Sequence, residues 1–228
     1  MRKFLAEFLG TFALVFAGTG AIVINDVTHG TITHVGIALT FGLIVLANVY
    51  ALGDVSGAHL NPAVTLGFAA ARRFSPALVG PYILSQIGGA FAASLLLHSL
   101  FPAHTGLGAT HPAGSEWQSF VLETGLTWLL MFVILGVSTG AKEKGTMAGI
   151  AVGAVIALEA LFAGPITGAS MNPARSLAPA LVSGSLQSLW VYLTAPVLGA
   201  FLAVLCCRCV QEPGCCVRNE IEPRPRPQ

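Results

Sequence analysis

The sequence predicts an all-α membrane protein with six transmembrane helices and two re-entrant half-helices, arranged as an inverted repeat of three plus three spans. Three observations carry this prediction: an apolar composition, six long apolar windows and a short motif that occurs twice. Hydrophobic residues make up 54% of the 228 residues and charged residues 9%, and the mean hydropathy is +0.77. Because a soluble domain carries about 25% charged residues, we expect this chain to lie in a lipid bilayer.

Six apolar windows are each long enough to cross the hydrocarbon core as a helix, which takes about 20 residues. Glu7, Glu123 and Glu159 are the only charged residues inside them. The first window follows Arg2 and Lys3, as a signal sequence would. It is too long for a signal sequence and has an acid near its start, so we expect it to remain as a span. In chain order the windows are about 4–24, 35–52, 78–100, 117–137, 146–163 and 187–207.

The basic residues indicate the orientation of the chain. Six spans place both termini on one side, together with ten of the eleven Lys and Arg residues. Because positive residues gather in cytoplasmic loops, we expect both termini in the cytoplasm, at a plasma membrane or a cell inner membrane. Arg175 is the exception, on the outer side between the last two windows. A charge at membrane depth is costly unless it lines water or is paired. Arg175 is therefore a functional candidate, with a surface-loop arginine as the alternative.

A ten-residue motif occurs twice, about 111 residues apart. Residues 57–66 read GAHLNPAVTL and residues 168–177 read GASMNPARSL. Glu7 and Glu123 are separated by a similar interval of about 116 residues. The chain is therefore predicted to be one domain, 1–207, built from similar halves at about 1–101 and 116–207. Because each half has three spans, the second must be inverted relative to the first.

Each copy of the motif predicts a short helix that begins at its asparagine. Asn is a favoured N-cap, and Pro is preferred at the first helical position. From Asn61 or from Asn172 there is room for about ten residues, or about 15 Å, against a core of about 30 Å. Two such half-helices meeting end to end would make one further span, with both N-terminal ends and both asparagines near the midplane. The extended backbone before each must be buried in protein or line an aqueous cavity.

These features together resemble the aquaporin (major intrinsic protein) family over residues 1–207. The resemblance rests on the doubled Asn-Pro-Ala, the Arg-Ser after the second copy, the paired glutamates and the six spans. AGIAVGAV at 148–155 and LFAGPITGASMNPARSL at 161–177 are most similar to the nodulin-26-like branch. The resemblance implies a passive channel for water and small uncharged solutes, assembled as a homotetramer in the bilayer. The spans contain no nucleophile–base pair, Gly-rich phosphate loop or metal-spaced cluster, so we expect no enzyme activity, cofactor, metal or nucleic acid partner.

The resemblance also implies which residues form the pore. An N-cap asparagine uses its oxygen on its own helix, so we expect the NH2 groups of Asn61 and Asn172 to be free to donate to the lumen. The two motifs would contribute Asn61, Pro62, Ala63, Asn172, Pro173 and Ala174. The narrowest ring would consist of Phe41, Ala160, Ala169 and Arg175. Backbone carbonyls would line the lumen at Gly57, Ala58, His59, Gly168, Ala169 and Ser170.

The ring favours a pore wider than water alone needs. Water-selective members usually have His at the position of Ala160, whereas this ring has two alanines in place of larger or polar groups. A ring widened in this way could pass glycerol, urea or a neutral metalloid acid such as boric, silicic or arsenous acid. Ser176 and Ala180 differ from a typical glycerol facilitator, which carries Asp and a basic residue there. A strictly water-selective channel is therefore an alternative. An ion-coupled secondary transporter, whose ionisable site could only be Glu159, and an adhesive membrane protein are others.

The remaining polar residues are interpreted individually. Glu7 and Glu123 would, by the resemblance, brace the backbone before the half-helices. Glu159 adjoins Ala160 and could touch the pore, lie between helices or face another subunit, whereas His59 could line the cytoplasmic vestibule or act as a brace. Small residues in the third window, Gly88, Gly89, Ala92 and Ala93, indicate close helix packing. The Pro-rich tail 208–228 is expected to be disordered. The five cysteines within 206–216 could be S-acylated, bind metal or have no role.

Overall fold

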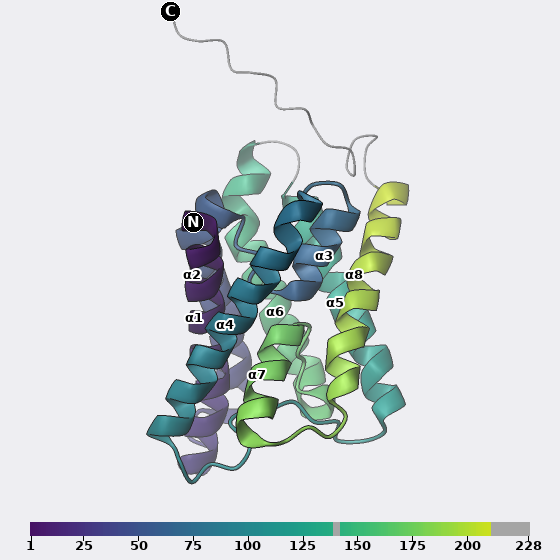
Figure 1. The fold of residues 1–228 in the computed structure, drawn as a ribbon. Helices are drawn as coiled ribbons and strands as arrows, with labels where there is room; N and C mark the ends of the chain where they lie inside the picture. Colours follow the sequence, from purple (N-terminus) through teal and green to yellow (C-terminus); the bar gives the residue numbers. More distant parts are fainter. Residues whose placement is uncertain (139–141, 211–228) are drawn as a thin grey trace, which may run out of the picture.

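Six long helices surround two short ones in the computed structural model, which describes residues 1–138 and 142–210 (Figure 1). All six long helices are apolar enough to cross a membrane, so the predicted fold class and the six spans are confirmed. The short helices are α3 and α7, and they contact each other inside the bundle. The helices are α1 (Arg2–Val27), α2 (Thr33–Ser56), α3 (Pro62–Ala70), α4 (Pro76–Leu100), α5 (Glu116–Val137), α6 (Lys142–Thr167), α7 (Pro173–Ser183) and α8 (Leu189–Val210).

Several helices run beyond the apolar windows that predicted them. α2 and α6 continue to Ser56 and Thr167, and the next residues, Gly57 and Gly168, have φ angles of +86° and +81°. Glycine adopts this left-handed conformation without steric cost and commonly ends helices. Hydropathy detects contact with lipid, whereas the end of a helix depends on backbone conformation. The windows therefore stop short of the glycines.

The C-terminal tail begins later than predicted. α8 ends at Val210, so residues 208–210 of the predicted tail are helical, because the apolar face of α8 continues through Cys207, which is fully buried. Cys206 and Cys209 in this last turn carry free thiols. The predicted disorder of 211–228, and the cysteines within it, lie outside the described residues.

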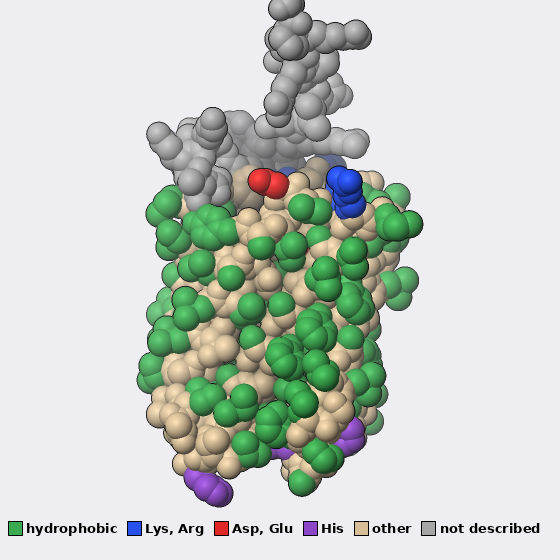
Figure 2. Space-filling model, turned by 90° about the vertical axis from the view of Figure 1, so that its left-hand side faces the viewer, with side chains coloured by type: hydrophobic (Ala, Val, Ile, Leu, Met, Phe, Trp, Pro, Cys, Tyr) green, Lys and Arg blue, Asp and Glu red, His purple; other side chains and the backbone are tan. Residues whose placement is uncertain are grey.

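The outer surface of the bundle is suited to lipid. Large apolar side chains cover the flank between Lys, Arg and acidic residues at one end and histidines at the other (Figure 2). Leu84 of α4 and Phe162 of α6 are two of the exposed apolar side chains of the protein, with 71% and 58% of their surface exposed. An apolar surface this extensive is not tolerated by a soluble monomer. The start of α1 and the end of α8 lie at the same end of the bundle (Figure 1), as six spans require.

The two halves repeat the same close helix contact. α1 packs against α4, and α5 packs against α8. A Cβ atom on Gly89 of α4 would overlap the carbonyl oxygen of Phe8, and one on Gly199 of α8 would overlap that of Thr124. Phe8 and Thr124 directly follow the paired glutamates. The glycines thus allow two helix pairs to approach at equivalent places, which sets the position of each glutamate.

We predict that Gly89→Ala destabilises the protein and that Gly80→Ala, on the same helix, does not. Adding a methyl group at Gly89 forces α1 and α4 apart, and overpacking of this kind typically costs about 1–3 kcal/mol. A Cβ atom at Gly80 meets nothing within 4 Å. There alanine should be neutral or slightly stabilising, because it favours the helix. Thermal unfolding of both variants in detergent tests this, and equal midpoints would contradict the predicted contact.

Candidate functional site

The two half-helices begin with the same cap. Asn61 precedes α3 in an extended conformation, and its Oδ1 accepts a hydrogen bond from the backbone N of Ala63 at 2.9 Å. Asn172 precedes α7 in the same way, and its Oδ1 accepts from the N of Ala174 at 3.0 Å and of Arg175 at 3.3 Å. A proline stands in the first turn of both helices. The sequence predicts both starts correctly.

The side-chain amides of the two asparagines cross from one half of the chain to the other. Nδ2 of Asn61 donates to the carbonyl oxygen of Met171 at 2.7 Å, and Nδ2 of Asn172 donates to that of Leu60 at 2.9 Å. The expectation that both NH2 groups are free is therefore wrong, since each spends one N–H on the opposite half. An amide has two such donors, so one N–H of each asparagine remains.

Glu7 holds the extended backbone before α3. Its side chain is fully buried, and Oε1 accepts hydrogen bonds from the Oγ of Ser56 at 2.7 Å and the N of His59 at 2.9 Å. Oε2 accepts from the N of Leu60 and the Nε2 of Gln86, both at 2.7 Å. A carboxylate is an acceptor on both oxygens, so four donors converge on one side chain.

Glu123 repeats this arrangement before α7. It is also fully buried, and Oε1 accepts from the Oγ1 of Thr167 at 2.8 Å and the N of Ser170 at 2.9 Å. Oε2 accepts from the N of Met171 at 2.8 Å. The backbone donors and the hydroxyl donor are the repeat equivalents of those around Glu7. Sequence-matched glutamates therefore have matching surroundings.

The backbone that the glutamates hold is strained. Ala58 and Leu60 have φ angles of +46° and +52°, and their counterparts Ala169 and Met171 have +41° and +54°. Residues other than glycine rarely adopt this region, and each such residue costs on the order of 1–3 kcal/mol unless its surroundings enforce it. The hydrogen bonds to the buried carboxylates supply that enforcement.

One cavity is lined by residues of both capped ends, and its wall combines both asparagines with all four predicted ring residues. The wall also includes Ala58, His59 and Ser170 from the extended segments. Gly57 and Gly168 are not part of it, because they end α2 and α6. The prolines and alanines of the two motifs are buried and are not part of the wall. The predicted residues in the wall are Asn61, Asn172, Phe41, Ala160, Ala169 and Arg175, and the apolar remainder is Leu14, Val45, Leu60, Val64, Leu130, Ile134, Val152, Ile156 and Met171.

Arg175 points inward and contacts a second ring residue. Only 1% of its surface is exposed, so the alternative of a surface-loop arginine is wrong. Its Nη1 donates to the carbonyl oxygen of Gly108 at 2.8 Å, and its Cζ lies 5.1 Å from the centre of the Phe41 ring. Nε has no hydrogen-bond partner within the described part of the chain. The guanidinium is thus held at the cavity wall with a donor to spare.

The other candidate side chains divide between the cavity and the interior. His59 belongs to the cavity wall, while its Nδ1 lies 3.1 Å from Oγ1 of Thr65 and its ring stacks on Phe68 with centroids 4.6 Å apart. It therefore combines both expected positions. Glu159 is fully buried and is not part of the wall, and its carboxyl oxygens have no hydrogen-bond partner among the residues described. Of its three possible positions, the one between helices is observed.

Residues 1–207 match the family model described as major intrinsic protein. The chain belongs to the major intrinsic protein family. It is 51% identical to aquaporin NIP1-1 of Oryza sativa over 88% of this chain and 71% of the relative. It is 46% identical to nodulin-26 of Glycine max over 88% of this chain and 74% of the relative. The predicted resemblance to the aquaporin family, and to its nodulin-26-like branch, is confirmed.

A solved structure agrees with the fold of this major intrinsic protein. The X-ray structure of the aquaglyceroporin from Plasmodium falciparum is similar with a TM-score of 0.82 at 28% identity, over 92% of this chain and 96% of that one. The inverted repeat with two re-entrant half-helices is therefore the architecture of the chain.

Three residues of the site escape prediction from the sequence. Gln86, a partner of Glu7, is a polar residue inside an apolar window, a signal that could have identified it. Gly18 makes room for the side chain of Phe41, because a Cβ atom at Gly18 would overlap it. Gly108 holds Arg175 from a loop that has no distinguishing pattern. No group of three His, Cys, Asp or Glu residues suited to a metal is found within residues 1–138 and 142–210.

We predict that Glu123→Gln destabilises this major intrinsic protein, whereas Glu116→Gln on the same helix has little effect. Glutamine would turn an NH2 group toward donors at Thr167, Ser170 and Met171, and one unsatisfied buried bond to a charged group costs about 1.5–3 kcal/mol. Glu116 is exposed at the start of α5, and it accepts hydrogen bonds from Ser188 and Trp190 at the surface, where water can replace a lost partner. Melting temperatures in detergent should differ by several degrees. An unchanged melt for Glu123→Gln would argue against its role as a brace.

Proposed function

We propose that this chain is a passive membrane channel for water and small uncharged solutes that excludes ions and protons. The observation that carries the proposal is the cavity whose wall joins two asparagine amides, both at half-helix N-termini, to the buried guanidinium of Arg175. The similarity to proteins named aquaporin and aquaglyceroporin supports the same function. Stopped-flow swelling of vesicles containing the protein, with a panel of solutes, tests it.

At the midplane, the spare N–H groups of Asn61 and Asn172 donate to a passing water. A water that accepts from both turns its own hydrogens toward the two ends of the pore, so it cannot relay a proton between two donors. The N-termini of α3 and α7 carry partial positive charge, and both face this point. That field repels cations, including hydronium, while neutral molecules pass.

Along the lumen, one side of the pore offers acceptors and the other is apolar. The backbone N–H groups of His59 and Leu60 are bound to Glu7, so the carbonyls of Ala58 and His59 are left to face the lumen. Ala169 and Ser170 do the same in the second half. The apolar part of the wall includes Val45 of α2 and Ile156 of α6. A solute with hydroxyl or amide groups on one side and a hydrocarbon edge on the other fits such a channel.

At the ring, Arg175 provides the donors and two alanines provide space. Ala160 and Ala169 contribute only methyl groups, and Phe41 closes the side next to the guanidinium. Pore diameter and available donors determine what passes. We therefore propose glycerol, urea or a neutral metalloid acid as solutes in addition to water. A channel restricted to water is the second candidate, favoured by the phenylalanine–arginine pair.

Two other functions are less well supported. An ion-coupled transporter needs an ionisable group at the substrate site, and Glu159 is not part of the cavity wall. An adhesive protein would not need a wall of aligned donors. The family consists of channels, and we propose that the chain catalyses no reaction and needs no cofactor or metal. Solute flux that saturates or follows a proton gradient would favour the transporter. The absence of any flux would favour the adhesive protein.

We further propose how the protein is placed. The domain 1–207 acts as one channel within a homotetramer, because the exposed apolar flank suits both lipid and neighbouring subunits. Ten of eleven basic residues share one side of the predicted topology, so both termini face the cytoplasm. The membrane is a plasma membrane or a cell inner membrane. Nucleic acid is not a partner.

We predict that Ala160→His keeps water flux and lowers the flux of glycerol, urea and boric acid. The imidazole fills a passage about one small solute wide, and it adds polar atoms where the parent has a methyl group. Water and solute flux are measured in the same vesicles, so that lower expression cannot imitate selectivity. If the parent excludes every solute larger than water, the wide ring is wrong and the chain is a water channel.

We predict that Arg175→Val raises the leak of protons or cations through an assembled channel. The substitution removes a fixed positive charge from the ring, which leaves the midplane field as the remaining barrier. Arg72→Gln removes a cation from an exposed position outside the cavity wall and serves as the control. A pH-sensitive dye inside vesicles under an imposed gradient reports the leak. Unchanged selectivity in a folded Arg175→Val variant would count against the assigned role.

A further inference from the structure

The segment between α4 and α5, residues 101–115, folds back onto the ring of the pore. Its Gly108 carbonyl is the acceptor for Nη1 of Arg175 at 2.8 Å, and Oγ1 of Thr110 donates to Oγ of Ser176, the next residue along α7, at 2.8 Å. The side chain of Leu107 is fully buried. The position of the guanidinium therefore depends on where this segment places residues 107 and 108.

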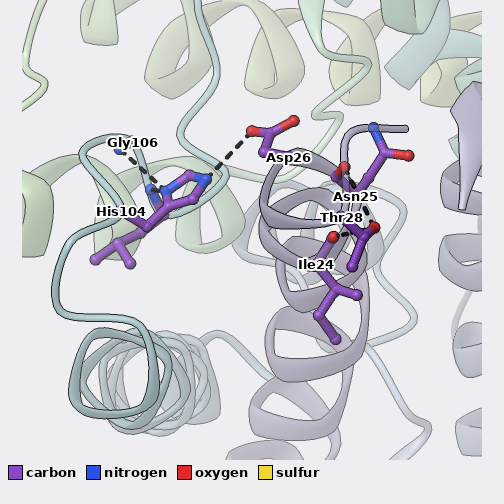
Figure 3. A network of polar contacts seen from close by, with 7 residues as sticks. Ile24, Asn25, Asp26, Thr28, His104 and Gly106 are labelled. Atoms are coloured by element: carbon purple, nitrogen blue, oxygen red, sulfur yellow. Dashed lines mark hydrogen bonds and ion pairs between the residues drawn. The ribbon is translucent and has the colours of Figure 1, made fainter. Parts of the chain in front are cut away.

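His104 is the side chain that fixes this part of the segment (Figure 3). Its Nδ1 lies 2.9 Å from the backbone N of Leu107 and 3.3 Å from that of Gly106. Its Nε2 lies 3.2 Å from Oδ2 of Asp26 at the end of α1. Because two N–H groups donate to Nδ1, that atom carries no proton. The proton of the neutral ring is on Nε2, which donates to Asp26.

The backbone held by His104 has an uncommon conformation. Leu107 and Gly108 have φ angles of +48° and +72°, and a Cβ atom on Gly108 would come within 2.7 Å of Thr19. A non-glycine residue in the left-handed region persists only where its surroundings enforce it. The N–H of Leu107 is bound to His104, so the histidine is one of the contacts that enforce it.

We propose that His104 is a positioning residue for Arg175 and that protonation of His104 releases the filter. The inference rests on the proposed channel function. The neutral ring accepts from Leu107 and thereby holds the Gly108 carbonyl against the guanidinium. A second proton on Nδ1 replaces the acceptor with a donor, which breaks both backbone bonds and leaves the ring paired with Asp26. Arg175 then loses its fixed partner and moves into the lumen, and flux falls.

The surroundings allow this protonation. Asp26, His104 and Gly106 line a hollow at the surface, so a proton from the outer solution can reach the ring. Asp26 is the titratable group that α1 presents to His104. α4 carries His98 in its last turn and the segment itself carries His111. Neither these two nor Arg175 of α7 makes an ion pair or hydrogen bond with His104 in the residues described.

The pH dependence has a defined direction. Acid adds the second proton to the imidazole ring of a histidine, so flux should be high at pH 8 and low at pH 5. We expect the full-length protein in vesicles, buffered equally on both sides, to lose about threefold or more in water and boric acid flux, consistent with losing about one hydrogen bond. His111→Asn, an exposed histidine of the same segment, should keep this profile.

Three variants separate positioning from a general structural role. His104→Asn places Oδ1 where Nδ1 was and cannot be protonated in this range. It should retain flux at pH 8 and lose the pH dependence. His104→Leu has no acceptor for the N–H of Leu107, so its flux should be low at every pH. Asp26→Asn keeps an oxygen that accepts from Nε2, so it should retain the parental flux at pH 8.

A second measurement is independent of transport. Hydrogen exchange of the Leu107 amide is compared between the parent and His104→Asn at the same pH, which cancels the intrinsic effect of pH on exchange. The parent should match the variant at pH 8 and exchange several-fold faster at pH 5. Vesicles that pass no water or solute at any pH would sink the channel proposal, while the exchange comparison would still decide the inference. The role proposed for His104 is overturned if an active parent channel shows the same flux at every pH. It is also overturned if parent and variant exchange equally at pH 5, or if His104→Asn keeps the pH dependence.

Discussion

The pore depends on two buried carboxylates that satisfy backbone N–H groups where no helix can. Glu7 and Glu123 accept hydrogen bonds from the extended segments before α3 and α7. A bilayer offers no water to unpaired backbone groups, so irregular backbone at this depth needs partners within the protein. A carboxylate suits the task because it accepts several bonds at once and donates none. Turning the N–H groups outward leaves the carbonyls on the side where a lumen can form.

The remaining features of the site follow from that constraint. Strained residues such as Ala58 and Ala169 keep positive φ angles because neighbouring N–H groups are tied to the glutamates. This fixes each asparagine as the cap of its half-helix. It also brings the carbonyls of Leu60 and Met171 within reach of the opposite amide. Both halves use the same arrangement of a buried carboxylate and a capping asparagine, and only the second adds Arg175. The proposed ring is therefore asymmetric, although its framework is nearly two-fold.

The sequence predicts those parts of the structure whose signals are local. Asn-Pro marks both half-helices, since the capping chemistry lies within three residues. The glutamates are recognisable because the same acid recurs at the same place in two halves. The crossed amide bonds were missed because they depend on how the halves meet in space, which spacing along the chain does not encode. Gly108 was missed because a loop carbonyl that binds an arginine leaves no pattern in residue type.

The crossed amide bonds between Asn61 and Met171 and between Asn172 and Leu60 also impose an order on biosynthesis. The first pair is separated by 110 residues, and ribosomes add about 5–20 residues per second. For roughly 5–20 s, by that rate, a nascent first half holds an amide and a carbonyl with no partner at membrane depth. The first half-helix therefore reaches its final position only after the second half has been synthesised. A chain cut between the halves would present these unsatisfied groups indefinitely.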